Sequence, residues 1–425
     1  MCYTDYRCGW GRNVQLTLND TTRGNRLHIG LFGRRNAGKS SLINALTGQS
    51  VATVSAVPGT TTDPVYKAME LHGIGPVVFI DTAGFDDEGE LGRLRVEKTE
   101  QAARETDIAL LLFSGLDMAE ELKWLALFHQ QKTPVILVVS CTDEREDAGE
   151  ALVRAVEAAA AVCPLRVSAK EKQGLEELRQ EIIRALPEDY EQPSITGDLC
   201  RAGDTVVLVM PQDIQAPKGR LILPQVQTLR ELLDKGCQAV CCTTDRLKET
   251  LAKLKEPPQL IITDSQAFKE VYPLKPADTL LTSFSVLFAA FKGDMDYFLQ
   301  GAEALLTLKP TARILIAEAC THKPLQEDIG RVKLPRLLRR KIGAGLQIDI
   351  VSGKDFPRDL TGVDLVIHCG ACMFNRKYVL NRVREARAQG IAMTNYGLSI
   401  AALLGILPMV ALPNGKKYAT MKDRH

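Results

Sequence analysis

One short segment limits the possible folds of this chain more than any other. Residues 33–40 read Gly-Arg-Arg-Asn-Ala-Gly-Lys-Ser, which fits the pattern G-x-x-x-x-G-K-S. The apolar run Leu27–Phe32 precedes the segment, and the helical pattern Ser41–Leu46 follows it. A phosphate-binding loop requires this order of strand, loop and helix, because its glycines let backbone N–H groups surround a phosphate at a helix N-terminus. The segment therefore predicts a nucleotide-binding α/β sheet.

The residue types in this loop suit phosphate and Mg²⁺ chemistry. The Lys39 ammonium would reach the β- and γ-phosphate oxygens, and the Ser40 hydroxyl would bind Mg²⁺. The alternative is a glycine-rich turn without a ligand. If the loop binds a nucleotide, the residues that contact it are Gly33, Asn36, Ala37, Gly38, Lys39, Ser40 and Ser41.

Two further segments complete a predicted Mg²⁺ and γ-phosphate site. Asp81 follows the apolar run Val77–Ile80 and can hold the Mg²⁺ shell, and the N–H of Gly84 can meet the γ-phosphate. Thr60 and Thr61 lie in a loop between the two motifs. A Thr there completes the Mg²⁺ shell only when the γ-phosphate is present, which would make the loop a switch. A solvated turn is the alternative for this loop. The predicted catalytic residues are Lys39, Thr61, Asp81 and Gly84.

Two segments at predicted strand ends could recognise the base of the nucleotide. Asp143 lies shortly after the run Val135–Val139, and a carboxylate can accept hydrogen bonds from guanine N1 and N2, which adenine cannot offer. Ser168 and Ala169 follow Leu165–Val167, and the N–H of Ala169 can meet guanine O6. The pattern favours guanine.

Short β-branched runs alternate with helical patterns along most of the chain, which predicts parallel sheets covered by helices. We expect three α/β units after an N-terminal tail. The expected boundaries are 1–25 for the tail, 26–190 for a P-loop unit, 191–305 for a middle unit and 306–425 for a C-terminal unit.

Composition excludes several classes of protein. The net charge is +1, from 53 Lys and Arg against 52 Asp and Glu, which argues against a nucleic-acid binder. The first ten residues hold charges and no apolar core, and no apolar run reaches 18 residues, so we expect neither a secretory signal nor a membrane span. We expect a cytoplasmic protein whose 11 cysteines are reduced.

Three of these cysteines lie with two histidines at predicted strand ends. Cys320 and His322 follow the run Ala312–Ala317, and His368, Cys369 and Cys372 follow Asp364–Ile367. Because parallel strands end at one edge of a sheet, the two groups can converge. Three thiolates with one histidine could bind Zn²⁺ or a 4Fe-4S cluster, and the sequence leaves both open. A redox dithiol at Cys369 and Cys372 is a further alternative, and either histidine could be a polar wall residue instead of a ligand.

The five nucleotide segments together resemble the translation-factor-related GTPases, close to the tRNA-modification and ribosome-assembly enzymes. This resemblance implies GTP hydrolysis with Mg²⁺, and a K⁺ ion bound at Asn36. The base motif departs from the family pattern, because Ser140 and Cys141 replace the usual Asn or Thr and Lys, so we expect weak guanine affinity and weak turnover. Phe85 stands where Ras-like enzymes place a water-orienting Gln, so the polar group that orients the water must come from elsewhere.

The GTPase motifs followed by C-x-H and H-C-x-x-C resemble the iron-iron hydrogenase maturation GTPases, the HydF family, from about Arg26 to Leu407. The resemblance implies a GTPase domain, a middle dimerisation domain and a C-terminal cluster-binding domain. It implies that Cys320, Cys369 and Cys372 hold a 4Fe-4S cluster, with His322 or His368 at a variable fourth position. It further implies a homodimer that could form a tetramer. Such a scaffold receives a di-iron precursor from radical-SAM maturation enzymes and delivers it to apo iron-iron hydrogenase. The rival functions are an RNA-acting GTPase and a zinc-containing regulatory GTPase.

Overall fold

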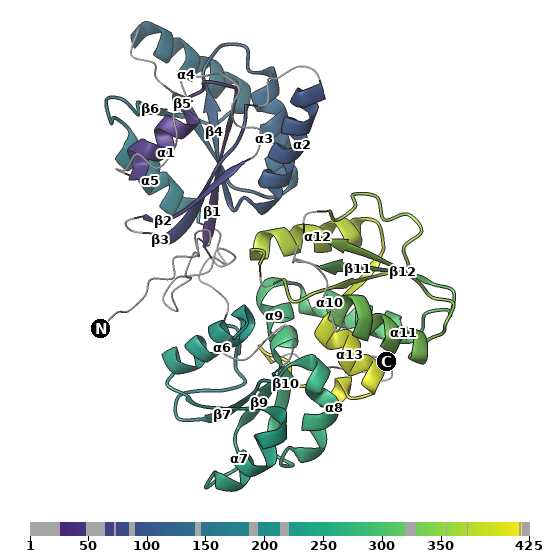
Figure 1. Ribbon diagram of the computed structural model, residues 1–425. Coiled ribbons are helices and arrows are strands. Elements are labelled where there is room, and N and C mark those ends of the chain that lie inside the picture. Colours follow the sequence, from purple (N-terminus) through teal and green to yellow (C-terminus); the bar gives the residue numbers. More distant parts are fainter. Residues whose placement is uncertain are drawn as a thin grey trace, which may run out of the picture.

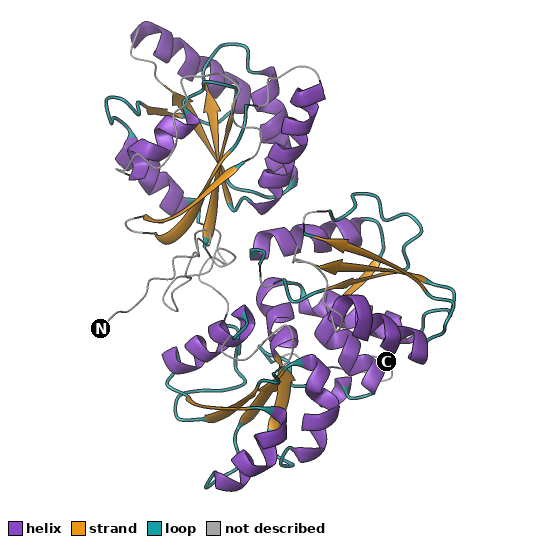
Figure 2. Cartoon of the chain, viewed as in Figure 1, coloured by secondary structure: helices purple, strands orange, loops and turns teal. Residues whose placement is uncertain are grey.

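The computed structural model describes residues 26–47, 64–71, 74–84, 90–140, 146–186, 194–212, 221–318, 329–353, 355–371, 373–415 and 418. Within these ranges the chain forms three sheets, each flanked by helices (Figures 1 and 2). The predicted α/β class with three units is therefore confirmed. Among the described helices, none is both long and apolar enough to cross a membrane.

The first unit is a six-stranded sheet in the order β2-β3-β1-β4-β5-β6. The four apolar runs named above are strands β1, β3, β5 and β6, and they pair in parallel with one another or with β4, as expected for runs buried on both faces. The antiparallel edge strand β2 was not predicted. The strands are β1 (Leu27–Gly33), β2 (Val65–Leu71), β3 (Gly75–Asp81), β4 (Ile108–Phe113), β5 (Val135–Ser140) and β6 (Leu165–Val167). The helices are α1 (Lys39–Thr47), α2 (Glu90–Glu105), α3 (Ala119–Gln130), α4 (Glu146–Ala160) and α5 (Leu175–Arg184).

Both faces of this sheet are packed. Ile43 of α1 and Ile182 of α5 belong to one apolar cluster, and Phe128 of α3 and Val156 of α4 belong to another. The first unit therefore has its own hydrophobic core.

The middle unit has a four-stranded parallel sheet in the order β10-β9-β7-β8. Its strands are β7 (Thr205–Val209), β8 (Gln238–Cys242), β9 (Leu260–Thr263) and β10 (Leu280–Ser283). Its helices are α6 (Leu223–Asp234), α7 (Leu247–Lys253), α8 (Phe268–Val271) and α9 (Phe284–Lys292), with short 3-10 turns η2 (Thr244–Arg246), η3 (Ser265–Ala267) and η4 (Tyr272–Leu274).

The last unit repeats this plan with the order β12-β11-β13-β14, all parallel. Its strands are β11 (Arg313–Glu318), β12 (Gln347–Ser352), β13 (Leu365–His368) and β14 (Ala392–Asn395). Its helices are α10 (Met295–Leu306), η5 (Ile329–Lys333), α11 (Leu334–Lys341), α12 (Arg376–Ala388), α13 (Tyr396–Leu404) and η6 (Leu407–Met409). The register pairs Ala317 with His368, so β11 and β13 end side by side.

The middle and last units share one hydrophobic core. Val207 and Ile261 of the middle sheet lie in the same apolar cluster as Ile316 and Leu365 of the last sheet. Figure 1 shows these two units packed together, and the first unit contacts them where α2 meets α12. We conclude that the last two units form one folded body.

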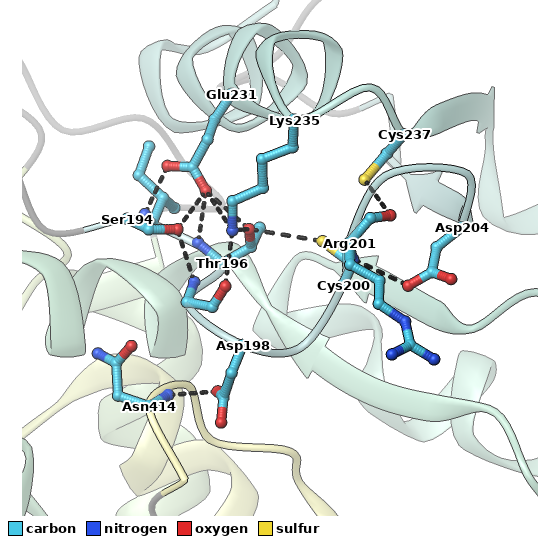
Figure 3. A network of polar contacts seen from close by, with 12 residues as sticks. Ser194, Thr196, Asp198, Cys200, Arg201, Asp204, Glu231, Lys235, Cys237 and Asn414 are labelled. Carbon is cyan, nitrogen blue, oxygen red and sulfur yellow. Dashed lines mark hydrogen bonds and ion pairs between the residues drawn. The ribbon is translucent and has the colours of Figure 1, made fainter.

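A polar network fixes the start of the middle unit (Figure 3). The Glu231 carboxylate of α6 accepts hydrogen bonds from Ser194 Oγ at 2.9 Å and from Thr196 Oγ1 at 2.7 Å. Nearby, the Asn414 N–H donates to Asp198 Oδ1 at 2.6 Å. Burial alone would raise the pKa of Glu231, but the hydrogen bonds from Thr196 and its neighbours outweigh burial and hold that pKa below its usual value. The network joins this segment to α6 and to the C-terminal segment.

Candidate functional site

The phosphate loop lies between β1 and α1, as predicted. Gly38 has a φ of 86° and Asn36 a φ of 59°, so the loop uses the left-handed region that lets successive N–H groups face inward. The Lys39 side chain is 7% exposed, and its Nζ donates to the carbonyl oxygens of Gly33 and Arg34, each at 2.7 Å. Phosphate oxygens arriving at the loop would compete with these two carbonyls for the ammonium.

The two predicted protein ligands of Mg²⁺ in the described residues lie in contact. Ser40 Oγ donates to Asp81 Oδ2 at 2.6 Å. The β1–β3 register, which pairs Leu31 with Asp81, brings them together. Thr82 Oγ1 also donates to the Leu31 carbonyl, which fixes the chain as it leaves β3 toward Gly84. Thr60 and Thr61 lie outside the described residues.

Ser140 and Ser168, the described residues that begin the two predicted base-recognition segments, lie at the sheet edge next to the phosphate loop. A Cβ built on Gly38 would lie 3.0 Å from Ser140 Oγ, so Ser140 packs against the loop. The β5–β6 register pairs Ser140 with Val167 and so brings Ser168 to the same edge. Ser168 Oγ accepts the Glu171 N–H at 3.1 Å and closes the turn that contains half-buried Ala169. Asp143 lies outside the described residues, so guanine selectivity stays a prediction.

An ion pair that the sequence did not predict braces the phosphate loop. Arg34 Nε contacts Glu121 Oε1 of α3 at 3.0 Å, and Arg34 Nη2 contacts Asp117 Oδ2 at 3.0 Å. Glu121 is 1% exposed, and burial raises its pKa while the Arg34 charge acts against that shift. Asp117 and Glu121 belong to no motif, and the phosphate-loop pattern leaves position 34 open, so no local signal could have linked them to Arg34.

Cys369 is the one predicted cluster cysteine that the described residues contain. It follows β13 directly, and its N–H donates to the Ala317 carbonyl at 3.0 Å. Its Sγ accepts the Ala371 N–H at 3.4 Å, and Ala371 is held in the left-handed region at a φ of 51°. Hydrogen bonds to ligand sulfurs also occur at iron–sulfur clusters, where they help to set the reduction potential, so this contact is compatible with a cluster ligand. Cys320, His322 and Cys372 lie outside the described residues.

His368 is held on both ring nitrogens. Its side chain is buried, Nδ1 lies 2.7 Å from the Cys369 carbonyl oxygen, and Nε2 lies 2.8 Å from Arg382 Nη1. Because a guanidinium only donates and a carbonyl only accepts, we assign a neutral ring with the proton on Nδ1. Burial, aided by the Arg382 charge, lowers the His368 pKa to about 3. His368 could bind a metal only if one of these contacts opened, so its role as a ligand stays a prediction.

Two buried cations contact or lie beside the Cys369 turn, which we define by its described residues 369–371, 373 and 374. Lys292, at the end of α9, is 1% exposed, and its Nζ donates to the carbonyl oxygens of Ala371 at 3.2 Å and Phe374 at 2.7 Å. Arg382 is 2% exposed and, besides its contact with His368, its Nη2 donates to the Gly353 carbonyl at 2.6 Å. Its guanidinium carbon lies 4.7–4.9 Å from the ring centroids of Phe356, Phe374 and Tyr378. Neither cation was predicted from the sequence.

The first unit reaches the same turn through α12. Asn375, the N-cap of α12, donates from Nδ2 to the Glu105 carbonyl at the end of α2, at 2.7 Å. Asn381 Nδ2 donates to the neighbouring Arg104 carbonyl at 2.7 Å. Burial raises the pKa of Asp107 beside this contact to about 7, although the His28 N–H and the Lys377 charge act against the shift. The end of α2 is therefore bound to the helix that begins two residues after the turn.

The described part of the chain contains no preformed metal site. There, no three His, Cys, Asp or Glu side chains come together in a way that could hold a metal ion. Three of the five predicted cluster residues lie outside those ranges. The paired thiols Cys200 and Cys237 are buried, and burial with the nearby Cys200 raises the Cys237 pKa to about 11, which argues against a reactive thiolate there.

Strand order, phosphate loop and the Ser40–Asp81 contact define the first unit as a P-loop nucleotide-binding domain. The tRNA modification GTPase MnmE of Burkholderia thailandensis is 36% identical over 176 residues, which is 39% of this chain and 37% of that protein. MnmE of Paraburkholderia xenovorans is 36% identical over 160 residues, 37% of this chain and 34% of that protein. The chain thus spans about a third of the length of these relatives.

Two solved structures are similar to part of the chain. Era of Aquifex aeolicus bound to GDP and AlF4⁻ is 19% identical, with a TM-score of 0.35, over 53% of this chain and 97% of that one. The G domain of the T. maritima FeoB iron transporter is 22% identical, with a TM-score of 0.30, over 38% of this chain and 99% of that one.

Three family models match successive parts of the chain. Residues 28–141 match the 50S ribosome-binding GTPase model, so the first unit is a GTPase domain. Residues 195–293 match the hydrogen maturase F dimerization domain, and residues 296–412 match its tetramerization domain. The chain belongs to the hydrogen maturase F family, the HydF family to which its motifs pointed. The family model that matches the last unit is named for tetramerization and not for cluster binding. Cluster binding by that unit is therefore a proposal.

Proposed function

We propose that this chain is a GTP-hydrolysing scaffold in the maturation of iron-iron hydrogenase. It binds a 4Fe-4S cluster, receives a di-iron precursor from radical-SAM maturation enzymes and delivers it to apo-hydrogenase. The observation that carries this proposal is the joining of a P-loop GTPase domain to both hydrogen maturase F domains in one chain. Those two domains also support a homodimer that assembles further to a tetramer.

In the first unit, GTP binds with Mg²⁺. Lys39 leaves its two loop carbonyls for the β- and γ-phosphate oxygens, where its charge offsets the charge that develops during transfer. Ser40 and Asp81, already in contact, would hold Mg²⁺, and Thr61 would add a further ligand when the γ-phosphate is present. Asn36 helps to bind K⁺, Gly84 meets the γ-phosphate, and Asp143 with Ala169 binds guanine.

In the last unit, Cys320, Cys369 and Cys372 hold the cluster, with His322 or His368 as the variable fourth ligand. Support comes from Cys369, whose sulfur accepts a backbone N–H. Further support comes from the two buried cations beside the turn, which suit a negatively charged thiolate cluster. When bound, a cluster with three thiolates supplies one iron with a replaceable ligand.

The contacts between α2 and α12 support a link between nucleotide and cargo. We expect GTP with Mg²⁺ to order the loop Gly84–Gly89 as well as Thr60–Thr62, and Gly84–Gly89 precedes α2 in the chain. The far end of α2 is bound to Asn375 and Asn381 of α12. GTP hydrolysis then releases the switch loops and biases partner docking or release, and its chemistry does not act on the metal cargo.

The function is tested by separating the two sites in the full chain. In Lys39→Ala, GTP hydrolysis should be lost, because the phosphate charge is no longer offset, while iron bound after anaerobic purification stays at the wild-type level. Exposed Lys123, changed to Ala, is the control and should alter neither. Iron lost together with GTP hydrolysis in Lys39→Ala would contradict separable sites.

One observation favours a second candidate, an RNA-acting GTPase: the similarity of the first unit to the MnmE proteins. The balanced charge and the maturase domains in the rest of the chain weigh against it. RNA binding by the full chain that weakens steeply with salt would favour this candidate, and our proposal predicts no such binding.

A further inference from the structure

Lys292 is an unusual residue for its position. It ends α9, whose sequence Phe284–Lys292 is otherwise almost entirely apolar, and it belongs to the dimerization-domain match. A lysine at a helix end ordinarily extends its ammonium into water. Here the side chain is 1% exposed and its ammonium lies 5.7 Å from the centroid of the Phe288 ring.

The ammonium is directed at the Cys369 turn of the next domain. It donates to the carbonyl oxygens of Ala371 and Phe374, which stand on either side of positions 372 and 373. The Phe374 N–H also donates to the Ala371 carbonyl, at 3.1 Å, so the lysine and the turn use one acceptor. Lys292 thus holds both ends of the segment in which Cys372 is the predicted ligand.

The turn needs such support. Ala371 is a non-glycine residue in the left-handed region, a conformation that persists only where surrounding contacts impose it. Its N–H donates to Cys369 Sγ and its carbonyl accepts from Lys292, so both of its peptide groups are engaged. The geometry that places the Cys369 sulfur is coupled in this way to a residue of the middle unit.

We propose that Lys292 is a positioning residue for the predicted cluster: it fixes the Cys369 turn from the dimerization domain and places a positive charge beside the cluster, which favours the reduced form. This inference rests on the proposed cluster function. The sign follows from charge, because reduction adds an electron, and a buried cation nearby stabilises the more negative state.

The test uses the full chain, reconstituted anaerobically with iron and sulfide, and measures the cluster midpoint potential. Lys292→Met keeps the length and removes the charge, so its potential should shift to lower values. Lys292→Arg keeps the charge and should stay near the wild-type potential. The matched control is Lys275→Met, since Lys275 Nζ also donates to backbone carbonyls, those of Pro276, Ala277 and Thr279. An unchanged potential in a fully loaded Lys292→Met would overturn the proposal.

A second readout needs no cluster. In the metal-free chain, the backbone amides of residues 373–379 should exchange hydrogen faster in Lys292→Met than in the wild type, and Lys275→Met should leave them unchanged. Loss of the cluster in Lys292→Met with retention in Lys292→Arg supports the proposal. Loss in both, with unchanged amide exchange, overturns it. A wild-type chain that binds no cluster would instead refute the proposed function, and amide exchange would still decide whether Lys292 holds the turn.

Discussion

The phosphate loop and the Cys369 turn are built in opposite ways. The Ser40–Asp81 and Arg34–Glu121 contacts that shape the phosphate loop come from the first unit itself. The Cys369 turn is held by residues of other units. Lys292 of the middle unit donates a hydrogen bond to the turn, and Asn375, which follows the turn, donates one to Glu105 of the first unit. Among the described residues, the first site is held by contacts within its own unit, and the second is held by contacts from all three units.

The largest effect is expected from a change at the nucleotide site, which tests whether that site is independent of the Cys369 turn. Asp81→Asn should lower GTP turnover by about 10²–10³-fold, as loss of one preorganised electrostatic group does, because the Mg²⁺ shell loses its carboxylate. Amide exchange at residues 373–379 in the nucleotide-free chain should stay at the wild-type rate. Faster exchange there would show that the two sites are not built independently.

A change at the contact between α2 and α12 should have the converse effect. Asn375→Ser keeps an N-cap oxygen for the Tyr378 N–H but removes the amide donor to the Glu105 carbonyl. We expect the α2–α12 contact to weaken by about 1 kcal/mol, the net worth of one hydrogen bond. Hydrogen exchange should quicken at the end of α2 and the start of α12, with GTP turnover unchanged. Asn375→Ala removes the cap as well and should show a larger effect.

The stability of the contact between α2 and α12 should also depend on pH, through Asp107. Its pKa is raised to about 7 in the fold, against about 3.9 for an unfolded chain. The folded state therefore holds more protons between these values, and its stability falls as pH rises through 7. His28, Lys377 and Arg376 also face this carboxyl. Protection of α12 amides, corrected for intrinsic exchange, should decline from pH 6 to 8 in the wild type. The same decline in Asp107→Asn would assign it to another group.

A network away from both sites should affect stability alone. The Glu231 pKa lies below its usual value, so its hydrogen bonds contribute fully above about pH 4.5 and are lost as pH falls further. Glu231→Gln should lower the melting temperature at pH 7, and its difference from the wild type should shrink as pH falls below 4.5. GTP turnover at pH 7 should be unaffected. A melting difference that grows in acid would contradict the assignment.

The features predicted correctly from the sequence are those that depend on residues next to one another in the chain. The phosphate loop, the Asp81 strand end and the buried parallel strands each depend on contiguous residues, and they are found where expected. Strand β2 was missed because its residues are mostly exposed or half-buried at a sheet edge, without a strong apolar run. Lys292, Arg382 and Asn375 were missed for a different reason. Each acts through long-range contacts, and nothing adjacent to a lysine at the end of an apolar helix signals where its ammonium will lie.

The central claim is that one chain combines a GTPase domain with a cysteine-bound iron–sulfur cluster. Its most direct test is iron, sulfide and zinc analysis of the anaerobically purified chain, with Cys369→Ser, and with Cys163→Ser as the control because Cys163 is an exposed free thiol of the first unit. We predict a brown protein that contains iron and sulfide, which Cys369→Ser loses and Cys163→Ser keeps. A colourless protein that contains zinc, or iron retained in Cys369→Ser, would contradict the claim.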